Sequence, residues 1–325
     1  MKRLESQSND PTQVSLGKLI LHPTIFKIQI GEKLFWISSW FFLNVAVTIM
    51  NKLFFHKFHF RFPVLISCSH MGVTCIFSYW TVRKLNLPIT IQKDQKKNLI
   101  LFSILFMSNI LTGNFGLRYV SVSLVQVVRS TIPGITIALS IILLNKRYSL
   151  KHYLAIFLIV VGVILASLGE VEFHLTGFVS VVLVCFLSAL KSVLSNKFLI
   201  GSMSFHPFVL LYYMSLFSFL QLYVISIVIG ELQDAVYWWL ENGSAGLFIF
   251  LLTNSLFAFL LNVSNFYTNQ KTSALTVTVI GNLKHIITIV LSIIIFDTPL
   301  TMLNIFGTVV TVIGAGIYSI IELKK

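Results

Sequence analysis

The stretch that decides the fold is "TSALTVTVIGNLKHIITIVLSIIIF", residues 272–296. It is apolar and long enough to cross a bilayer, whose hydrocarbon core takes about 20 helical residues. Lys284 and His285 lie at its middle. A cation at the centre of a bilayer costs roughly 2.5–3.5 kcal/mol on insertion scales, and the segment has no carboxylate to offset that cost. The stretch therefore predicts a membrane helix whose lysine faces something other than lipid.

The whole chain has the composition of a membrane protein. Of its 325 residues, 56% are hydrophobic and 11% are charged, and the mean hydropathy is +0.87. Soluble domains carry about 25% charged residues, so lipid must cover the apolar surface of this chain. Apolar runs of about 20 residues predict an all-α polytopic membrane protein with ten transmembrane helices near residues 34–55, 62–82, 98–117, 121–144, 152–169, 175–198, 206–230, 245–269, 273–296 and 300–321.

The basic residues predict the orientation. If the N-terminus is cytosolic, cytosolic segments hold 17 of the 24 Lys and Arg residues, and the opposite side holds only Lys57, Arg61 and Arg118. The positive-inside rule then places both termini in the cytosol. The polar first 33 residues, with Glu5 and Asp10, resemble neither a secretory signal nor a transit peptide. The net charge of +13 follows from this topology, and no nucleic-acid partner is expected.

The two halves of the chain repeat one another. The segment "NKLFFHKFHFRFPVLIS" from residue 51 is echoed by "NKFLIGSMSFHPFVLLY" from residue 196, and Gly162 recurs as Gly314, 152 residues later. The predicted organisation is a cytosolic tail at 1–33, a five-helix repeat at 34–170, and a second repeat with a short cytosolic tail at 171–325. Five helices are an odd number, so the halves have opposite topology. Inverted repeats are typical of alternating-access transporters, with the substrate site between the halves near the midplane. An ancient duplication kept only for packing is the alternative.

Charges inside the predicted helices are unbalanced. All eleven acidic residues fall in tails, loops or helix ends, whereas helix interiors contain Lys52, Arg129, Lys191 and Lys284. Buried cations without protein anions need another partner, and phosphate groups suit both Arg and Lys. The pattern predicts anionic, phosphorylated small-molecule substrates. Lys52 lies near a helix end, where it could instead snorkel to the interface, and Lys191 allows either interpretation.

Arg129 and His285 carry further local information. Pro133 follows Arg129 by four residues, so the Arg129 carbonyl loses its helical hydrogen-bond donor. A buried arginine beside a lost backbone hydrogen bond is costly for packing alone, which favours a role in a site. His285 follows Lys284 directly and therefore points roughly 100° away around the helix. A satisfied core histidine is the alternative to a ligand at that position.

Several stretches resemble one transporter family. "YVSVSLVQVVRSTIP", "NVSNFYTNQKTSALTVTVIGNLKH" and "SALKSVLSNKF" are similar to motifs of the triose-phosphate and nucleotide-sugar translocator family, within the drug/metabolite transporter superfamily. The resemblance covers nearly the whole span from the first helix to the tenth. It implies that Arg129 and Lys284 bind phosphate and that polar positions of the third helix fall near Asn109 and Thr112. The other candidate substrate-binding residues are Asn51, Lys52, Gln126, Lys191, Asn282 and His285.

The substrate class follows from the same resemblance. A single residue separates Asn282 from Lys284, a spacing similar to the nucleotide-sugar branch, whereas His285 fits neither branch. We expect an antiporter that exchanges a nucleotide sugar for a nucleoside monophosphate. Because the N-terminus does not resemble the transit peptide of plastid members, we expect it in a Golgi or endoplasmic reticulum membrane. The alternative is exchange of a sugar phosphate for inorganic phosphate.

Other functions have less support in the sequence. The predicted helices contain no His-carboxylate pair and no clustered His or Cys ligands, so we expect neither an enzyme nor a metal or cofactor. A receptor or scaffold would tolerate loss of Arg129 and Lys284. Gly307, Gly314 and Gly316 predict that the last helix is structural and offers a face for a homodimer.

Overall fold

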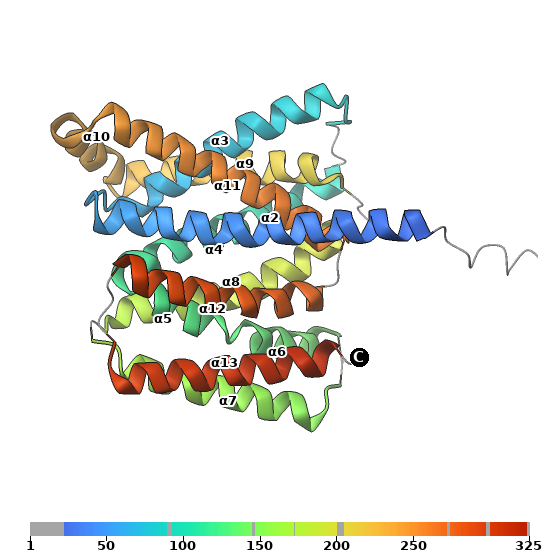
Figure 1. Ribbon diagram of the computed structural model, residues 1–325. Helices are drawn as coiled ribbons and strands as arrows, with labels where there is room; N and C mark the ends of the chain where they lie inside the picture. The colour runs from blue at the N-terminus through green and yellow to red at the C-terminus, as the bar shows by residue number, and fades with distance from the viewer. Residues whose placement is uncertain are drawn as a thin grey trace, which may run out of the picture.

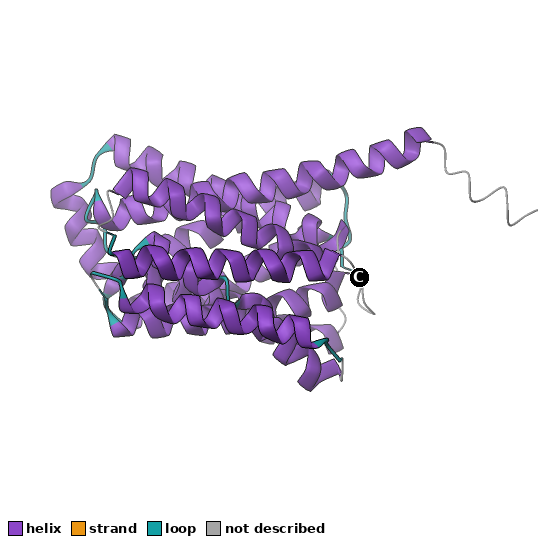
Figure 2. Cartoon of the chain, turned by 60° about the horizontal axis from the view of Figure 1, so that its bottom comes forward, coloured by secondary structure: helices purple, strands orange, loops and turns teal. Residues whose placement is uncertain are grey.

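The computed structural model describes residues 23–89, 93–144, 147–171, 173–199, 205–271, 274–296 and 300–323. The described chain is helical, apart from loops and one isolated bridge between Glu170 and Leu300, as Figures 1 and 2 show. This agrees with the predicted all-α class. The helices are α2 (Pro23–His56), α3 (Pro63–Lys84), α4 (Lys93–Tyr119), α5 (Val122–Arg129), α6 (Ile132–Leu144), α7 (Leu150–Leu168), α8 (Leu175–Leu199), α9 (Pro207–Val228), α10 (Glu231–Asn242), α11 (Ala245–Lys271), α12 (Ala274–Phe296) and α13 (Met302–Leu323).

The bundle has two faces where helices begin and end. The start of α2 and the end of α13 lie at the same end of the bundle (Figure 1), which we name the terminal face. The end of α2, the start of α13 and the short helix α10 lie at the other end, which we name the opposite face.

Eight segments are long and apolar enough to span a bilayer. They are residues 31–56, 95–119, 122–139, 150–168, 175–192, 207–228, 245–271 and 302–321, and each corresponds to a predicted span. The two remaining predicted spans are α3 and α12. Polar side chains lower the hydropathy of α3. They pack inside the protein rather than against lipid, because Ser67, His70, Thr74 and Ser78 are at most 3% exposed. In α12 the described apolar segment is Ile287–Phe296. A total of ten spans stays a prediction.

The predicted helix at 121–144 is not continuous. The structure divides it into α5, which ends at Arg129, and α6. Pro133 has no N–H to donate to the Arg129 carbonyl, and its ring disfavours a continuous helix there. The Thr131 hydroxyl donates to the Val128 carbonyl at 2.8 Å, which caps the broken end. The sequence predicted the lost hydrogen bond but not the full interruption.

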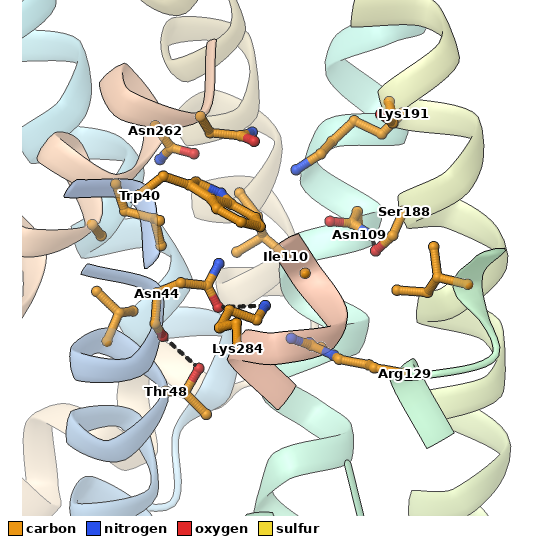
Figure 3. Close-up of a pocket in the computed structure, with 18 of the residues that line it drawn as sticks. Trp40, Asn44, Thr48, Asn109, Ile110, Arg129, Ser188, Lys191, Asn262 and Lys284 are labelled. Atoms are coloured by element: carbon orange, nitrogen blue, oxygen red, sulfur yellow. Dashed lines mark hydrogen bonds between the residues drawn. The ribbon is translucent and has the colours of Figure 1, made fainter. Parts of the chain in front are cut away.

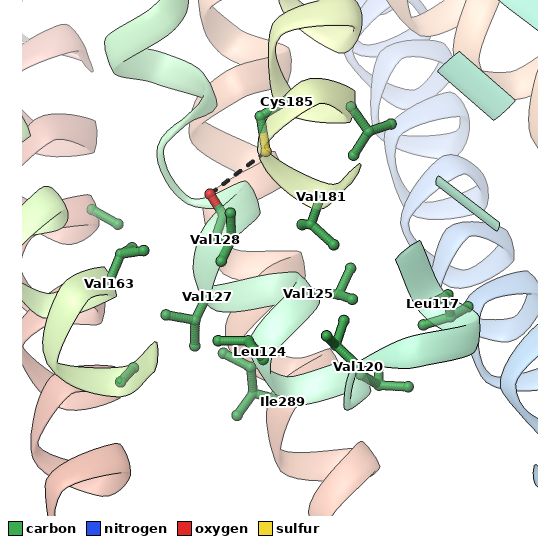
Figure 4. Packing of buried hydrophobic residues seen from close by; sticks show 14 of the residues in the cluster. Leu117, Val120, Leu124, Val125, Val127, Val128, Val163, Val181, Cys185 and Ile289 are labelled. Carbon is green, nitrogen blue, oxygen red and sulfur yellow. Dashed lines mark hydrogen bonds between the residues drawn. The ribbon is translucent and has the colours of Figure 1, made fainter. Parts of the chain in front are cut away.

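Helix α5 is fixed at the centre of one apolar cluster. Val127 and Val128 are each 1% exposed, and they share a cluster with Val163 of α7 and Ile289 of α12, as Figure 4 shows. The Cys185 thiol of α8 lies 3.6 Å from the Val128 carbonyl and donates to it. Three neighbouring helices therefore hold the short helix that carries Arg129.

Helix α10 was not predicted. It is a 12-residue helix, too short for a search based on membrane-spanning length. Gly230 has a φ of 76° and turns the chain out of α9. Glu231 and Asp234 then occupy the first turn, where the helix dipole favours negative charge. Trp238 packs on Phe60 with ring centroids 5.1 Å apart, so α10 covers the opposite face of the bundle.

Glycines bring α7 and α13 into close contact, as predicted for small residues on the last helix. A Cβ added at Gly307 would collide with the backbone of Ala166 and Gly162. One added at Gly314 would lie 2.9 Å from a backbone nitrogen of α7, whereas Gly316 has open space around it. Gly307 and Gly314 therefore pack inside the chain, and they give no support to a dimer face.

Helix contacts show a regular pairing across the chain. Helix α3 packs along α9, α7 along α13, and α5 against α12. Helix α4 also packs against α8 and α9, and helix α11 packs against α2 and α3.

Candidate functional site

A cavity of about 280 Å³ runs along the axis of the bundle. Helices α2, α3, α4, α5, α6, α8, α11 and α12 all contribute to its lining. It extends from Asn51 and Leu117, near the opposite face, to Asn269, two residues before the end of α11 at the terminal face. Figure 3 shows its central part. We name it the central cavity.

Three cations from three helices line the central cavity. They are Lys284 of α12, Arg129 of α5 and Lys191 of α8, and none of the described lining residues is Asp or Glu. Figure 3 shows the Lys191 and Arg129 side chains extending towards the space beside Lys284. The sequence predicted all three residues for one site. Since a buried cation is costly without a counter-charge, the arrangement suits an anion with more than one negative charge.

Lys284 is 5% exposed and has only neutral partners among the described residues. Its Nζ donates to the Asn44 Oδ1 at 2.9 Å and lies 5.3 Å from the centroid of the Trp40 ring. A hydrogen bond and a cation–π contact each lower the cost of burying the ammonium group. Neither contact supplies a negative charge, so the ammonium group has no counter-charge among these partners.

Arg129 occupies the end of a helix that favours a cation. It is the last residue of α5, where the helix dipole is negative. Gly113 of α4 leaves room for its guanidinium, because a Cβ there would lie 3.3 Å from an Nη atom of Arg129. Its Nε is buried without a hydrogen-bond partner in the described part of the chain. The guanidinium therefore has donors left for a ligand oxygen.

Lys191 lies further along the cavity, and its Nζ is 5.0 Å from the centroid of the Phe106 ring. Asn109 of α4 lines the same region and donates to Ser188 at 2.8 Å and to the Val184 carbonyl at 3.3 Å. These bonds tie α4 to α8 beside Lys191. They hold the Asn109 amide in place and leave its carbonyl oxygen available to a ligand hydroxyl.

His285 connects α12 to α5. Its Nδ1 lies 2.6 Å from the Gln126 Oε1, and Nδ1 must donate because an amide oxygen only accepts. His285 lines the central cavity, while Gln126 is fully buried behind it. The pair fixes the orientation of α12 next to Lys284, and the Nε2 of a neutral His285 is then an acceptor.

The remaining predicted residues are distributed as follows. Asn51 and Asn109 line the central cavity, whereas Thr112 and Lys52 are not among its lining residues. Lys52 turns towards the opposite face, where its Nζ donates to the carbonyls of Leu117 at 3.2 Å and Val120 at 2.8 Å. The Asn282 side chain lies outside the described residues.

Sequence reasoning missed most of the asparagines. The described lining contains seven: Asn44, Asn51, Asn109, Asn114, Asn262, Asn265 and Asn269. The three on α11 follow a spacing of three and four residues and thus share one helix face. That periodic pattern was visible in "NVSNFYTNQ" and was the signal that could have found them. Trp40 and Asn44 had no such signal.

Amide hydrogen bonds close the central cavity towards the opposite face. Asn51 donates to Asn114 at 2.8 Å, and Asn114 donates to Ser67 at 2.8 Å. Asn254 donates to the Asn51 Oδ1 at 2.7 Å. This network, which we name the amide lock, joins α2, α3, α4 and α11. It contains only neutral groups.

The fold and cavity together define an integral membrane protein of the carrier type, with a cationic cavity between its helices. Comparison with known proteins agrees with this class. The chain belongs to the Triose-phosphate Transporter family, whose model matches residues 32–319. Its relatives include the "UDP-galactose transporter 1" of Arabidopsis thaliana, which is 31% identical over 291 residues, covering 88% of this chain and 86% of the relative. The family and these relatives are transporters rather than enzymes, as the sequence predicted.

A second relative has a different substrate in its name. A "probable sugar phosphate/phosphate translocator" of Arabidopsis thaliana is 33% identical over 298 residues, covering 89% of this chain and 82% of the relative. One solved crystal structure superimposes with a TM-score of 0.58 at 9% identity, covering 88% of this chain and 98% of the other. That likeness concerns the fold alone.

Proposed function

We propose that the protein is an antiporter that exchanges a nucleotide sugar for a nucleoside monophosphate across a Golgi or endoplasmic reticulum membrane. The observation that carries the proposal is the central cavity with Lys284, Arg129 and Lys191 and no carboxylate in its described lining. Arginine binds phosphate oxygens as a fork and lysine binds them as a point charge. The asparagines beside them offer donors and acceptors of the kind that sugar hydroxyls need.

The pairing of helices supports ten spans in two inverted repeats, residues 34–170 and 171–325. If the first helix of one half corresponds to the first of the other, α2 matches α8, α3 matches α9 and α4 matches α11. The α5–α6 pair then matches α12, and α7 matches α13. Under this correspondence the contacts of α4 with α8 and of α2 with α11 are equivalent. So are those of α4 with α9 and of α11 with α3.

The charge distribution supports cytosolic termini. The terminal face would then be cytosolic and the opposite face lumenal, as the excess of basic residues favours. Alternating access would open the central cavity at one face while the other stays closed. The amide lock lies at that end of the central cavity, and we expect it to be the closure on the lumenal side.

The uncompensated cations also support exchange rather than free transport. Closing an empty cavity strips water from Lys284, Arg129 and Lys191, at several kcal/mol per ion after relaxation. A phosphorylated ligand compensates that charge, so the loaded carrier closes more readily. A barrier difference of about 4 kcal/mol would favour exchange roughly a thousandfold. The described lining holds no carboxylate to carry a proton or sodium ion, and no such coupling is expected.

Exchange of a sugar phosphate for inorganic phosphate is the second candidate. It is supported by the name of the translocator that is 33% identical to this chain. The cations suit either ligand, because both substrates bind through phosphate.

Proteoliposomes distinguish the two functions. Purified protein is reconstituted into vesicles that are empty, preloaded with a nucleoside monophosphate, or preloaded with inorganic phosphate. Uptake of UDP-sugars, GDP-sugars and sugar phosphates is then measured in each. The proposal expects nucleotide-sugar uptake only into vesicles with nucleoside monophosphate, and no response to a proton gradient. Lys284→Ala should abolish uptake, whereas Lys96→Ala, at an exposed lysine of α4, is the matched control.

Equal uptake into empty and preloaded vesicles would disprove exchange. Transport of sugar phosphates alone, against inorganic phosphate, would establish the second candidate instead.

A further inference from the structure

A second cavity, of about 860 Å³, lies at the opposite face. It is lined by the ends of α2, α4 and α12, the start of α5, and the segments at residues 57–61 and 170–171. We name it the vestibule. Its charged residues are Lys52, Lys57, Arg61, Arg118 and Glu170, and two histidines, His56 and His59, line it as well.

The charge of the vestibule is unusual for its side of the membrane. The sequence places only three basic residues in the predicted segments at the opposite face, Lys57, Arg61 and Arg118. All three line this one cavity. The positive-inside rule depletes such residues from that side, so topology does not explain their presence. Among the described residues, none of the three forms an ion pair within 4.0 Å, and Arg118 interacts with the Glu231 carboxyl only at longer range.

The basic segment is held in place rather than extended into solvent. Phe60, between Lys57 and Arg61, is 1% exposed, and its backbone N–H donates to the Phe54 carbonyl at 2.9 Å. Its ring packs against Trp238 of α10 at 5.1 Å. The buried anchor fixes the backbone on either side of it. The backbone that carries the two cations is therefore ordered before any ligand arrives, which lowers the entropy lost on binding.

The vestibule and the central cavity are separated by a single layer of the protein. Asn51 and Leu117 line the central cavity, and the residues that follow them, Lys52 and Arg118, line the vestibule. The N-terminal, positive end of α5 opens into the vestibule, whereas Arg129 at its other end lines the central cavity. An anion in the vestibule thus lies close to the amide lock. That network would have to open for the central cavity to become accessible from the opposite face.

We propose that the vestibule is a second ligand site, which binds a phosphate monoester or inorganic phosphate on the opposite face before it enters the central cavity. This rests on the proposed function, in which the nucleoside monophosphate returns from that side. The four cations of the vestibule outnumber its one described carboxylate. Fields of this kind raise the local concentration and association rate of anionic substrates, by roughly 10- to 1,000-fold in charged clefts.

A binding experiment tests the site without relying on transport. The Lys284→Ala/Arg129→Ala protein, in phosphatidylcholine nanodiscs, is titrated with radiolabelled uridine monophosphate and, separately, with inorganic phosphate. The proposal expects salt-sensitive binding of one or both. That binding should weaken at least tenfold in a further Lys57→Gln/Arg61→Gln/Arg118→Gln variant. The matched control is Lys84→Gln/Lys96→Gln/Lys97→Gln, which removes three exposed cations on the terminal side.

The two ligands identify the source of the phosphate. Tighter binding of uridine monophosphate shows that the nucleoside is recognised, and equal binding shows that phosphate suffices; both support the site. Absence of salt-sensitive binding, or equal loss in the control variant, overturns it. Loss of binding when anionic lipid is added to the nanodiscs also overturns it, because a headgroup would then be the occupant.

A transport experiment separates this proposal from the proposed function. In oriented vesicles, the vestibule variant should raise the concentration of nucleoside monophosphate for half-saturation at the opposite face about tenfold. Half-saturation by nucleotide sugar at the terminal face should stay unchanged. Wild-type protein that binds phosphate in the vestibule but exchanges no nucleotide would disprove the proposed function alone. Exchange with unaltered half-saturation in the variant would disprove the vestibule alone.

Discussion

Replacing Lys284 by methionine separates the charge of the central cavity from its packing. Methionine is unbranched and similar in length, so it keeps the apolar stem of the lysine. The ammonium group has two partners, the Asn44 Oδ1 at 2.9 Å and the Trp40 ring at 5.3 Å. Both are neutral, so the substitution leaves no buried counter-charge behind. Asn44 is only partly buried and can turn to water in the cavity.

The expected changes in stability nearly cancel. Losing a hydrogen bond to a charged group removes roughly 1.5–3 kcal/mol, and losing the cation–π contact removes about 0.5–2 kcal/mol. Removing the cation from mid-membrane regains roughly 2.5–3.5 kcal/mol. We therefore expect the melting temperature of Lys284→Met to lie within about 4 °C of wild type. Ligand binding should change far more, because truncating one partner of a buried charge pair costs about 2–5 kcal/mol, or thirtyfold to several thousandfold in Kd.

The assay measures both quantities on one sample. Thermal unfolding of the purified protein is followed with and without nucleoside monophosphate, and uptake is measured in proteoliposomes. Lys284→Met should unfold near the wild-type temperature, show no stabilisation by ligand and transport nothing. Lys97→Met, at an exposed position, should behave as wild type in all three measurements. Wild-type uptake by Lys284→Met would refute the reasoning, and a large loss of stability would show that the lysine is structural.

Three further predictions follow from particular contacts. Gly307→Leu should prevent folding, because the new side chain would collide with the backbone of α7. Gly316 has open space around it, so Gly316→Leu should give a normal peak in size-exclusion chromatography and Gly307→Leu should not. Arg129→Lys should keep partial uptake, since it retains charge and loses the guanidinium fork; full activity would contradict a bidentate contact. Burial raises the pKa of Glu231 above its ordinary value. The folded state thus holds that proton more tightly than the unfolded state, and this contribution to stability is lost as pH rises through the folded pKa. Relative to wild type, Glu231→Gln should therefore gain stability as pH rises through the acid range in thermal scans; an unchanged difference would contradict the prediction.

The sequence predicted the charged part of the site because charge inside a membrane is costly. Lys284, Arg129 and Lys191 were identified as cations without protein anions, and the structure brings them to one cavity. Helix positions were predictable because a helix that crosses lipid needs a long apolar run. Pro133 predicted the lost hydrogen bond at Arg129 but not the full interruption of the helix, which the structure shows with Thr131 capping the broken end.

Neutral groups were harder to predict. An asparagine in a membrane helix is compatible with packing, a helix cap or a ligand, and only its partners distinguish these roles. Asn44 gained its role from Lys284, which is 240 residues away in sequence. Lys52 was assigned to the substrate site, but the carbonyls at the end of α4 direct it to the vestibule. Such choices depend on tertiary contacts that one sequence does not reveal.

The amide lock at one end of the bundle and an ion pair at the other are both weak, so we expect the central cavity itself to control transport. At the opposite face, the amide lock exchanges amide–amide for amide–water hydrogen bonds when it opens, with a net difference of about 1 kcal/mol per bond. At the terminal face, Lys271 pairs with Glu32 at 3.0 Å with both side chains well exposed, and such surface pairs contribute little. We therefore expect neither set of contacts to hold the carrier shut by itself. The largest electrostatic change between empty and loaded states is the compensation of Lys284, Arg129 and Lys191, so the ligand itself would determine when the carrier reorients.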